Sequence, residues 1–194
     1  SRKERQQVRE GVRHRPAVVY EIIRVHGEIE LRRPSSALWW SGVAAGISIG
    51  FSFLTDAVLA AHLPASEWSP LIAKLGYAVG FLIVILGHQQ LFTENVLTAV
   101  LPVMARKQVH WLLKMLRLWG IVLAANIAGC LIFASAIAYL PVVPSNVTPA
   151  LADIVTKVMS NTPWEMFAKG IGAGWLIAAL VWILSSTEHV EFIV

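Results

Sequence analysis

Long apolar stretches alternate with short polar ones along this chain. A bilayer core about 30 Å thick is crossed by roughly 20 apolar residues in helical form. Four stretches reach that length: residues 39–61, 71–104, 118–140 and 166–185. The sequence therefore predicts an all-α fold, a polytopic bundle of transmembrane helices within residues 37–194.

The second stretch is too long for one ordinary crossing, because at ~1.5 Å per residue it would extend roughly 50 Å as a continuous helix. It also contains a polar block at residues 88–95, with the sequence His-Gln-Gln-Leu-Phe-Thr-Glu-Asn. Polar groups at hydrocarbon depth must face other protein or a water-filled cavity. We therefore expect this crossing to be interrupted near residues 87–95 and to line a permeation path.

Basic residues are distributed unevenly between the polar segments. Nine of the 16 Lys and Arg residues fall within residues 1–36, and the stretch 106–117 adds four with no acid. Segments 61–70 and 141–163 contribute only Lys157. The positive-inside rule then predicts a cytoplasmic N-terminus and one broken second crossing, because two complete crossings would place 106–117 outside. Topology also explains the net charge of +4 without a nucleic-acid partner.

Two polar segments contain apolar residues at helical spacing. Residues 1–36 form a basic N-terminal region, and the pattern within 16–30 predicts an amphipathic helix on the inner membrane surface. Docking of this helix against protein is the alternative. Residues 150–159 predict a second short amphipathic helix after a proline-rich connection.

Glycines recur on the apolar faces of three predicted crossings. Small residues spaced in this way let two helices approach closely, so we expect glycine-lined helix contacts in a tightly packed bundle. The glycines concerned are Gly42, Gly46 and Gly50 on the first crossing, Gly76 and Gly80 on the second, and Gly170, Gly172 and Gly174 on the fourth.

The polar block holds the first candidate site residues. Thr93 and Asn95 can donate hydrogen bonds to a partly dehydrated anion, beside an apolar constriction formed by Leu91 and Phe92. The alternative is that Thr93, Asn95 and Gln90 only satisfy backbone groups that the break leaves without partners.

Charged residues favour two different substrates. Lys169, just inside the fourth crossing, either reaches outward to the interface or attracts anions into an aqueous vestibule. Glu94 favours cations or protons, together with His88 or Asp56. The sequence leaves both interpretations open.

Motifs of soluble enzymes are missing from the sequence, which contains no P-loop, nucleophile elbow or paired-His zinc spacing. His189 lies between Glu188 and Glu191, but a solvated turn explains these residues without a metal. We therefore expect no enzymatic activity, no cofactor and no metal site.

Three ordered motifs resemble those of the formate/nitrite transporter family. The segments 27–31 and 87–90 resemble a little-characterised bacterial inner-membrane branch of that family more than its formate or nitrite channels. The three motifs are Leu91-Phe92-Thr93, then Arg117-Leu118-Trp119-Gly120 with Asn126 and Gly129, then Phe167-Ala168-Lys169-Gly170-Ile171 followed by Trp175-Leu176 and Trp182.

The resemblance implies an aquaporin-like protomer with six spans, assembled as a homopentamer with one pore per protomer. It implies that Leu91 and Phe92 form the constriction, that Thr93 supplies a hydroxyl near the pore centre, and that Lys169 is the vestibule cation. The chain departs from the family pattern in segment 87–90, and at Gly174, where the family has an asparagine.

The resemblance ends with the chain. It implies that a fifth, broken helix with a central histidine begins near residue 190, so the chain looks truncated before that helix.

Together these observations predict a channel or transporter in the inner (plasma) membrane for small monovalent anions such as formate or nitrite. A proton- or cation-coupled transporter centred on Glu94 is the first alternative. A membrane scaffold without transport is the second.

Overall fold

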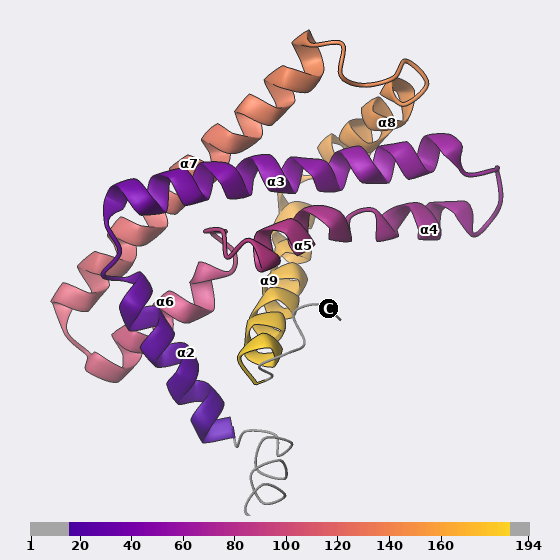
Figure 1. Ribbon diagram of the computed structural model, residues 1–194. Coiled ribbons are helices and arrows are strands. Elements are labelled where there is room, and N and C mark those ends of the chain that lie inside the picture. The colour runs from indigo at the N-terminus through magenta and orange to yellow at the C-terminus, as the bar shows by residue number, and fades with distance from the viewer. Residues whose placement is uncertain (1–15, 187–194) are drawn as a thin grey trace, which may run out of the picture.

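The computed structural model describes residues 16–186, which form eight helices and no strand (Figure 1). The predicted all-α fold is confirmed. The helices are α2 (Pro16–Glu30), α3 (Ser35–His62), α4 (Ser69–Leu75), α5 (Ala78–Leu86), α6 (Asn95–Arg106), α7 (Val109–Tyr139), α8 (Thr148–Met159) and α9 (Pro163–Ser186).

Four helical stretches are long and apolar enough to cross a membrane, as the hydropathy pattern predicted. They are Ser35–His62, Ser69–Leu86, Val109–Tyr139 and Pro163–Ser186, while Asn95–Arg106 is a shorter apolar helix. The span predicted to begin near residue 190 lies outside the described residues.

The helices extend further than their apolar cores. The third begins at Val109 rather than near residue 118, so most of the basic stretch 106–117 is the first part of α7 and not a loop. Only Lys107 and Gln108 separate α6 from α7, and Lys107 has the left-handed φ of 48°. Leu, Lys, Arg and Met are good helix formers, so the helix continues through this basic stretch. A prediction based on apolar stretches alone leaves such polar turns out.

The predicted interruption of the second crossing is confirmed. Helix α5 ends at Leu86 and α6 begins at Asn95, and residues 87–94 contain turns without a helix. His88 turns the chain here with a left-handed φ of 46°. A smaller irregularity between α4 and α5 was not predicted: the Gly76 and Tyr77 amides donate to carbonyls three residues earlier, at 3.0 and 3.1 Å.

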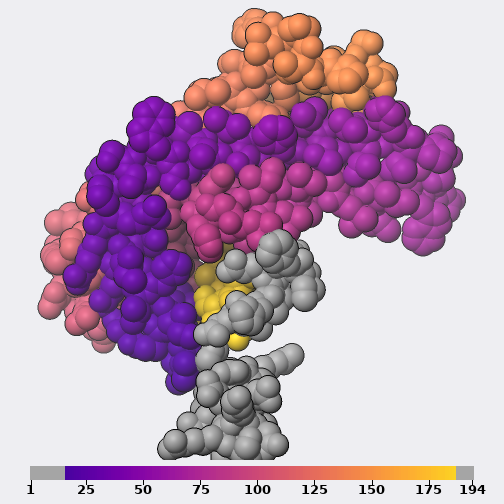
Figure 2. Space-filling model, in the orientation of Figure 1, coloured from indigo at the N-terminus to yellow at the C-terminus, as the bar shows by residue number. Residues whose placement is uncertain are grey.

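Helices α3 and α7 cross at glycine positions, in agreement with the sequence pattern. A Cβ on Gly46 would lie 2.3 Å from the Asn126 carbonyl oxygen, and one on Gly129 would lie 2.2 Å from the Val43 carbonyl oxygen. Both clashes are with backbone, so any side chain here would push the helices apart. Figure 2 shows α3 beside the α4–α5 segment, where the Gly80 amide donates to Ser52 Oγ at 3.1 Å.

Helix α9 departs from the predicted glycine packing. A Cβ on Gly170, Gly172 or Gly174 would meet no atom of the described residues within 4 Å. Val181 is the one buried residue of α9 among those described. The expectation of a glycine-lined contact on the fourth crossing is therefore wrong within residues 16–186, because no described helix lies against that face.

The amphipathic helix α2 docks on α6. Its buried residues Val19, Ile23 and Gly27 form one stripe at a spacing of four. Pro102 has no amide hydrogen, so the Thr98 carbonyl of α6 lacks its usual helical donor. Gly27 packs directly against this carbonyl, because a Cβ on Gly27 would lie 2.0 Å from its oxygen. The structure thus favours docking for this stripe, while a second apolar stripe on α2 stays exposed: Val18, Ile22, Val25 and Ile29.

A hydrophobic cluster joins the α2–α3 turn, α6 and α7 at the basic end of the bundle. Trp111 is only 6% exposed and belongs to this cluster. Phe92 packs against it from the break. The cluster consists of Leu31, Leu38, Ala99, Trp111, Met115, Leu118 and Val122.

Candidate functional site

Asn126 on α7 anchors the break. Its side-chain amide donates to the carbonyls of Gly42 at 2.8 Å and Gln90 at 2.9 Å, and its Oδ1 accepts from the Phe92 amide at 2.9 Å. An asparagine inside an apolar helix is costly unless it is satisfied in this way. One side chain therefore ties α3 and the interrupted segment to α7.

A second set of hydrogen bonds joins the break to α2 and α3. Gln90 Nε2 donates to Glu30 Oε2 at 2.9 Å, and Gln90 Oε1 accepts from Asn95 Nδ2 at 3.0 Å. The same Asn95 group lies 3.2 Å from the Leu91 carbonyl, and the Gln90 amide donates to Ser41 Oγ at 3.1 Å. Asn95 thus contacts a backbone carbonyl of the break, as its alternative role expected, whereas the Gln90 side chain bonds to the side chains of Glu30 and Asn95 and not to backbone.

Thr93 and Glu94 are different. Within residues 16–186 the Thr93 hydroxyl makes no hydrogen bond, and the residue is exposed. The half-buried Glu94 carboxylate makes neither an ion pair nor a hydrogen bond in the described part of the chain. In the segment 90–95, Thr93 and Glu94 are the two polar side chains that make no hydrogen bond or ion pair with residues 16–186.

A polar cavity of 70 Å³ lies between the break and α2. Gln89 borders it, and among residues 16–186 its buried Oε1 atom has no hydrogen-bond partner. The volume is enough for a small number of water molecules. The lining residues are His26, Glu30, Arg33, His88, Gln89, Gln90, Glu94, Asn95 and Thr98.

Electrostatics at the α2 wall of this cavity centre on His26 and Glu30, whose Nε2 and Oε1 atoms lie 3.6 Å apart. The adjacent Glu30 carboxylate raises the pKa of His26 above its ordinary value, despite the opposing effect of burial. Burial raises the pKa of Glu30, but the contacts with His26 and Arg33 outweigh it, so this pKa lies below its ordinary value. Both shifts favour the charged pair.

Leu91 and Phe92 have different neighbours. Leu91 faces a narrow apolar gap against α9, lined by Ile177, Leu180, Val181 and Leu184, which Glu94 also borders. The Phe92 ring packs edge-on against Trp119 of α7, with ring centroids 6.0 Å apart. The described residues therefore do not bring Leu91 and Phe92 together in one constriction.

Lys169 lies apart from the break. It is exposed near the start of α9, where its Nζ atom donates to Asn161 Oδ1. Leu91 meets α9 from Ile177 onward, so Lys169 is about 12 Å away along the helix axis. The structure places Lys169 near the start of α9 and not beside Thr93.

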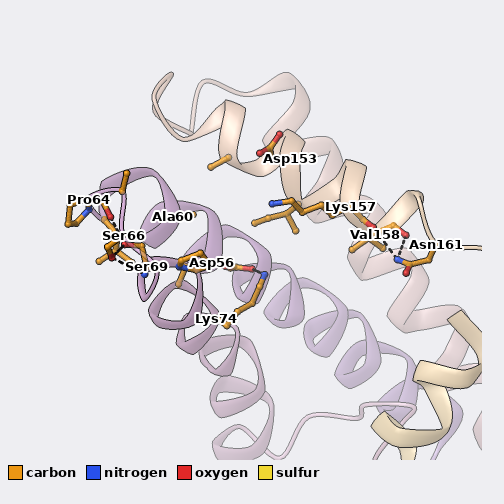
Figure 3. A pocket seen from close by; sticks show the side chains of 16 residues that line it. Asp56, Ala60, Pro64, Ser66, Ser69, Lys74, Asp153, Lys157, Val158 and Asn161 are labelled. Atoms are coloured by element: carbon orange, nitrogen blue, oxygen red, sulfur yellow. Dashed lines mark hydrogen bonds and ion pairs between the residues drawn. The ribbon is translucent and has the colours of Figure 1, made fainter. Parts of the chain in front are cut away.

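A larger pocket of 710 Å³ opens between α3, α4 and α8, and Figure 3 shows its lining. Asp56 is 1% exposed and pairs with Lys74, with Nζ 2.5 Å from Oδ2. Asp153, Lys157 and Asn161 line the pocket on the α8 side. Asp56 and Glu94 line separate cavities, so the structure does not join them in one site.

Metal ligands do not cluster within residues 16–186, where no three His, Cys, Asp or Glu residues could hold one ion. The prediction about His189 lies outside the described residues.

Sequence reasoning missed the anchoring role of Asn126 and the contribution of Glu30 and Ser41. Asn126 carried a usable signal, because an amide in an apolar helix must find partners. Glu30 carried none, since it belongs to a polar segment where such residues are common. Ser41 carried none either, since nothing in the apolar stretch 39–61 marks one serine as a partner of the break.

Comparisons with known proteins agree with this architecture. A model of the formate/nitrite transporter family matches residues 17–193. The chain is 44% identical over 180 residues to the inner membrane protein YfdC of Escherichia coli strain K12, covering 93% of this chain and 58% of YfdC.

Two more distant relatives are transport proteins by name. The chain is 26% identical to the uncharacterized transporter YrhG of Bacillus subtilis strain 168, over 87% of this chain and 64% of YrhG. It is 23% identical to the formate channel BtFdhC of Bacillus thuringiensis, over 90% of this chain and 68% of that channel. The chain thus spans less than two thirds of the length of YfdC and YrhG.

Proposed function

Because this chain belongs to the formate/nitrite transporter family, we propose that the protein conducts small monovalent anions, such as formate or nitrite, across the inner membrane. The family consists of membrane channels and transporters and not of enzymes, and the four candidate crossings fit a multi-pass membrane protein. The anion and the pore residues are the parts that we propose.

The unpartnered hydroxyl of Thr93 carries this proposal. Gln90, Asn95 and Asn126 form hydrogen bonds within the protein, whereas Thr93 makes none in the described part of the chain. A hydroxyl that stabilises no backbone is available to replace the water that an anion loses.

Lys169 and the two apolar residues complete the proposed path. Lys169, on the approach along α9, would raise the local concentration of anions. Leu91 faces α9, and Phe92 is fixed against Trp119, so each would present an apolar surface that an ion passes after partial dehydration.

Anion flux into liposomes that contain the purified protein tests these roles. Losing one hydrogen bond worth about 1 to 1.5 kcal/mol in Thr93→Val should lower flux roughly five- to tenfold, and Thr93→Ser should retain it. Lys169→Gln should lower flux most at low salt, where charges are least screened. Unchanged flux in both Thr93→Val and Lys169→Gln would contradict the proposed path, and no flux with the wild-type protein would favour a scaffold.

A second candidate is proton-coupled transport through Glu94, because this carboxylate borders both the polar cavity and the gap against α9 without a partner in residues 16–186. Flux driven by a pH gradient should then collapse in Glu94→Gln and survive in Glu165→Gln, a control at the exposed start of α9. Equal flux in both variants would remove this candidate.

Orientation and assembly complete the proposal. The excess of basic residues in segments 1–36 and 106–117 supports a cytoplasmic N-terminus. We also propose a homopentamer, which the mass of the purified protein in detergent tests directly.

A further inference from the structure

Three cations surround the indole ring of Trp111. The Arg32 and Arg106 guanidinium carbons lie 5.6 and 5.9 Å from the ring centroid, and Lys114 Nζ lies 5.0 Å from it. They come from the α2–α3 turn, the end of α6 and the second turn of α7. We call Arg32, Arg106, Lys114 and Trp111 the Trp111 cluster.

Acidic partners compensate only part of this charge. Arg106 pairs with Glu28, with Nε 2.9 Å from Oε1, whereas Arg32 and Lys114 have no carboxylate within ion-pair distance in residues 16–186. Arg117, three residues after Lys114 on α7, donates to the carbonyls of Leu31 and Arg33, so no carboxylate compensates its charge in residues 16–186 either. Like charges gathered on one ring repel each other, and a bound anion would relieve that repulsion.

The residues around the cluster have the pattern of a membrane interface. On the opposite face of α7, exposed apolar side chains reach down to Val109 and Leu113, which are 71% and 61% exposed. Trp40, at the neighbouring end of α3, is 70% exposed, as is usual for an aromatic side chain at headgroup level. The hydrocarbon boundary therefore falls close to the height of Trp111, on the side where basic residues accumulate.

We propose that the Trp111 cluster binds the phosphate of an anionic phospholipid headgroup in the cytoplasmic leaflet. Guanidinium groups bind phosphate oxygens with charge-assisted hydrogen bonds, and basic pockets between transmembrane helices suit such headgroups. The occupant is a lipid and not free phosphate, because the exposed apolar residues at this level bring headgroups to the cluster. This site is independent of the proposed anion path.

Native mass spectrometry of the purified protein tests the proposal, by titration with phosphatidylglycerol and with phosphatidylcholine of the same acyl chains. The wild-type protein should bind phosphatidylglycerol in preference. Removing one charge in Arg32→Gln or Lys114→Gln should weaken that binding about fivefold, and Lys114→Arg should restore it. Lys157→Gln, which removes an exposed lysine from α8, should leave it unchanged.

Two results would overturn the proposal. The first is equal weakening, or none, in Lys114→Gln and Lys157→Gln, with thermal unfolding midpoints showing that both variants are folded. The second is displacement of phosphatidylglycerol by inorganic phosphate at the same concentration, which would assign the site to a free anion.

Discussion

The two kinds of polar residue in the break behave differently. Gln90 and Asn95 are buried and bonded to one another, to α2 and to the local backbone, with Asn126 holding the same turn from α7. Thr93 and Glu94, between them in sequence, have side chains that make no hydrogen bond or ion pair in the described residues. Polarity at membrane depth therefore has two separate meanings, repair of the broken helix and availability to a substrate, and only the contacts distinguish them.

The largest effect should follow removal of the main anchor. Asn126→Leu leaves the Phe92 amide and the Gln90 carbonyl without their partner, and each unsatisfied buried group is costly. It also removes the second hydrogen bond of the Gly42 carbonyl, which keeps its helical bond within α3. We expect the free energy of unfolding to fall by about 2 to 4 kcal/mol. The thermal unfolding midpoint in detergent measures this. An unchanged midpoint would show that Asn126 does not hold the break.

A smaller loss should follow from cutting the link to α2. Gln90→Leu removes the bonds to Glu30 and Asn95, but the backbone of residue 90 keeps its contacts with Ser41 and Asn126. We expect a loss of about 1 to 2 kcal/mol. Hydrogen exchange should show faster opening of α2, with Asn161→Leu, a half-buried amide between α8 and α9, as the control. Loss of protection in α3 but not in α2 would contradict the link.

The break itself was predictable, because the length of a helix and the thickness of a bilayer are fixed quantities. It was not predictable which of its polar residues hold the break and which do not, since Gln90 finds partners 36 and 60 positions away in the sequence. The same limit applies to glycine: Gly46 and Gly172 give similar patterns, yet only Gly46 lies against another described helix. A sequence pattern states what a surface could contact, and packing decides whether anything is there.

Docking of α2 should depend weakly on pH through His26 and Glu30. The raised pKa of His26 means that its stabilising charge is fully present below the ordinary value of 6.5 and is lost as pH rises through the folded value. The lowered pKa of Glu30 means that its contribution is present above 4.5 and is lost as pH falls through its folded value. Protection of α2 should therefore be greatest between these ordinary values.

The pH effect should be small, because the His26 side chain is 58% exposed and solvent screens the pair. Arg33 and Glu94 also act on His26, in opposite directions. In His26→Gln, the protection of α2 from hydrogen exchange should no longer fall as pH rises above this range. It should still fall as pH drops below the range. A variant with the wild-type profile would assign the decline to another group.

The smallest effect should come from Thr93, which is why this residue tests the comparison most directly. Thr93→Val keeps the side-chain shape and removes a hydroxyl that bonds to nothing in residues 16–186, so the free energy of unfolding should change by less than about 0.5 kcal/mol. Asn126→Leu, the matched polar-to-apolar change, should lower the unfolding midpoint in the same detergent. If Thr93→Val destabilises the protein as much, Thr93 belongs with the anchors. A stable variant with reduced anion flux would separate the residue that serves the substrate from those that hold the helix.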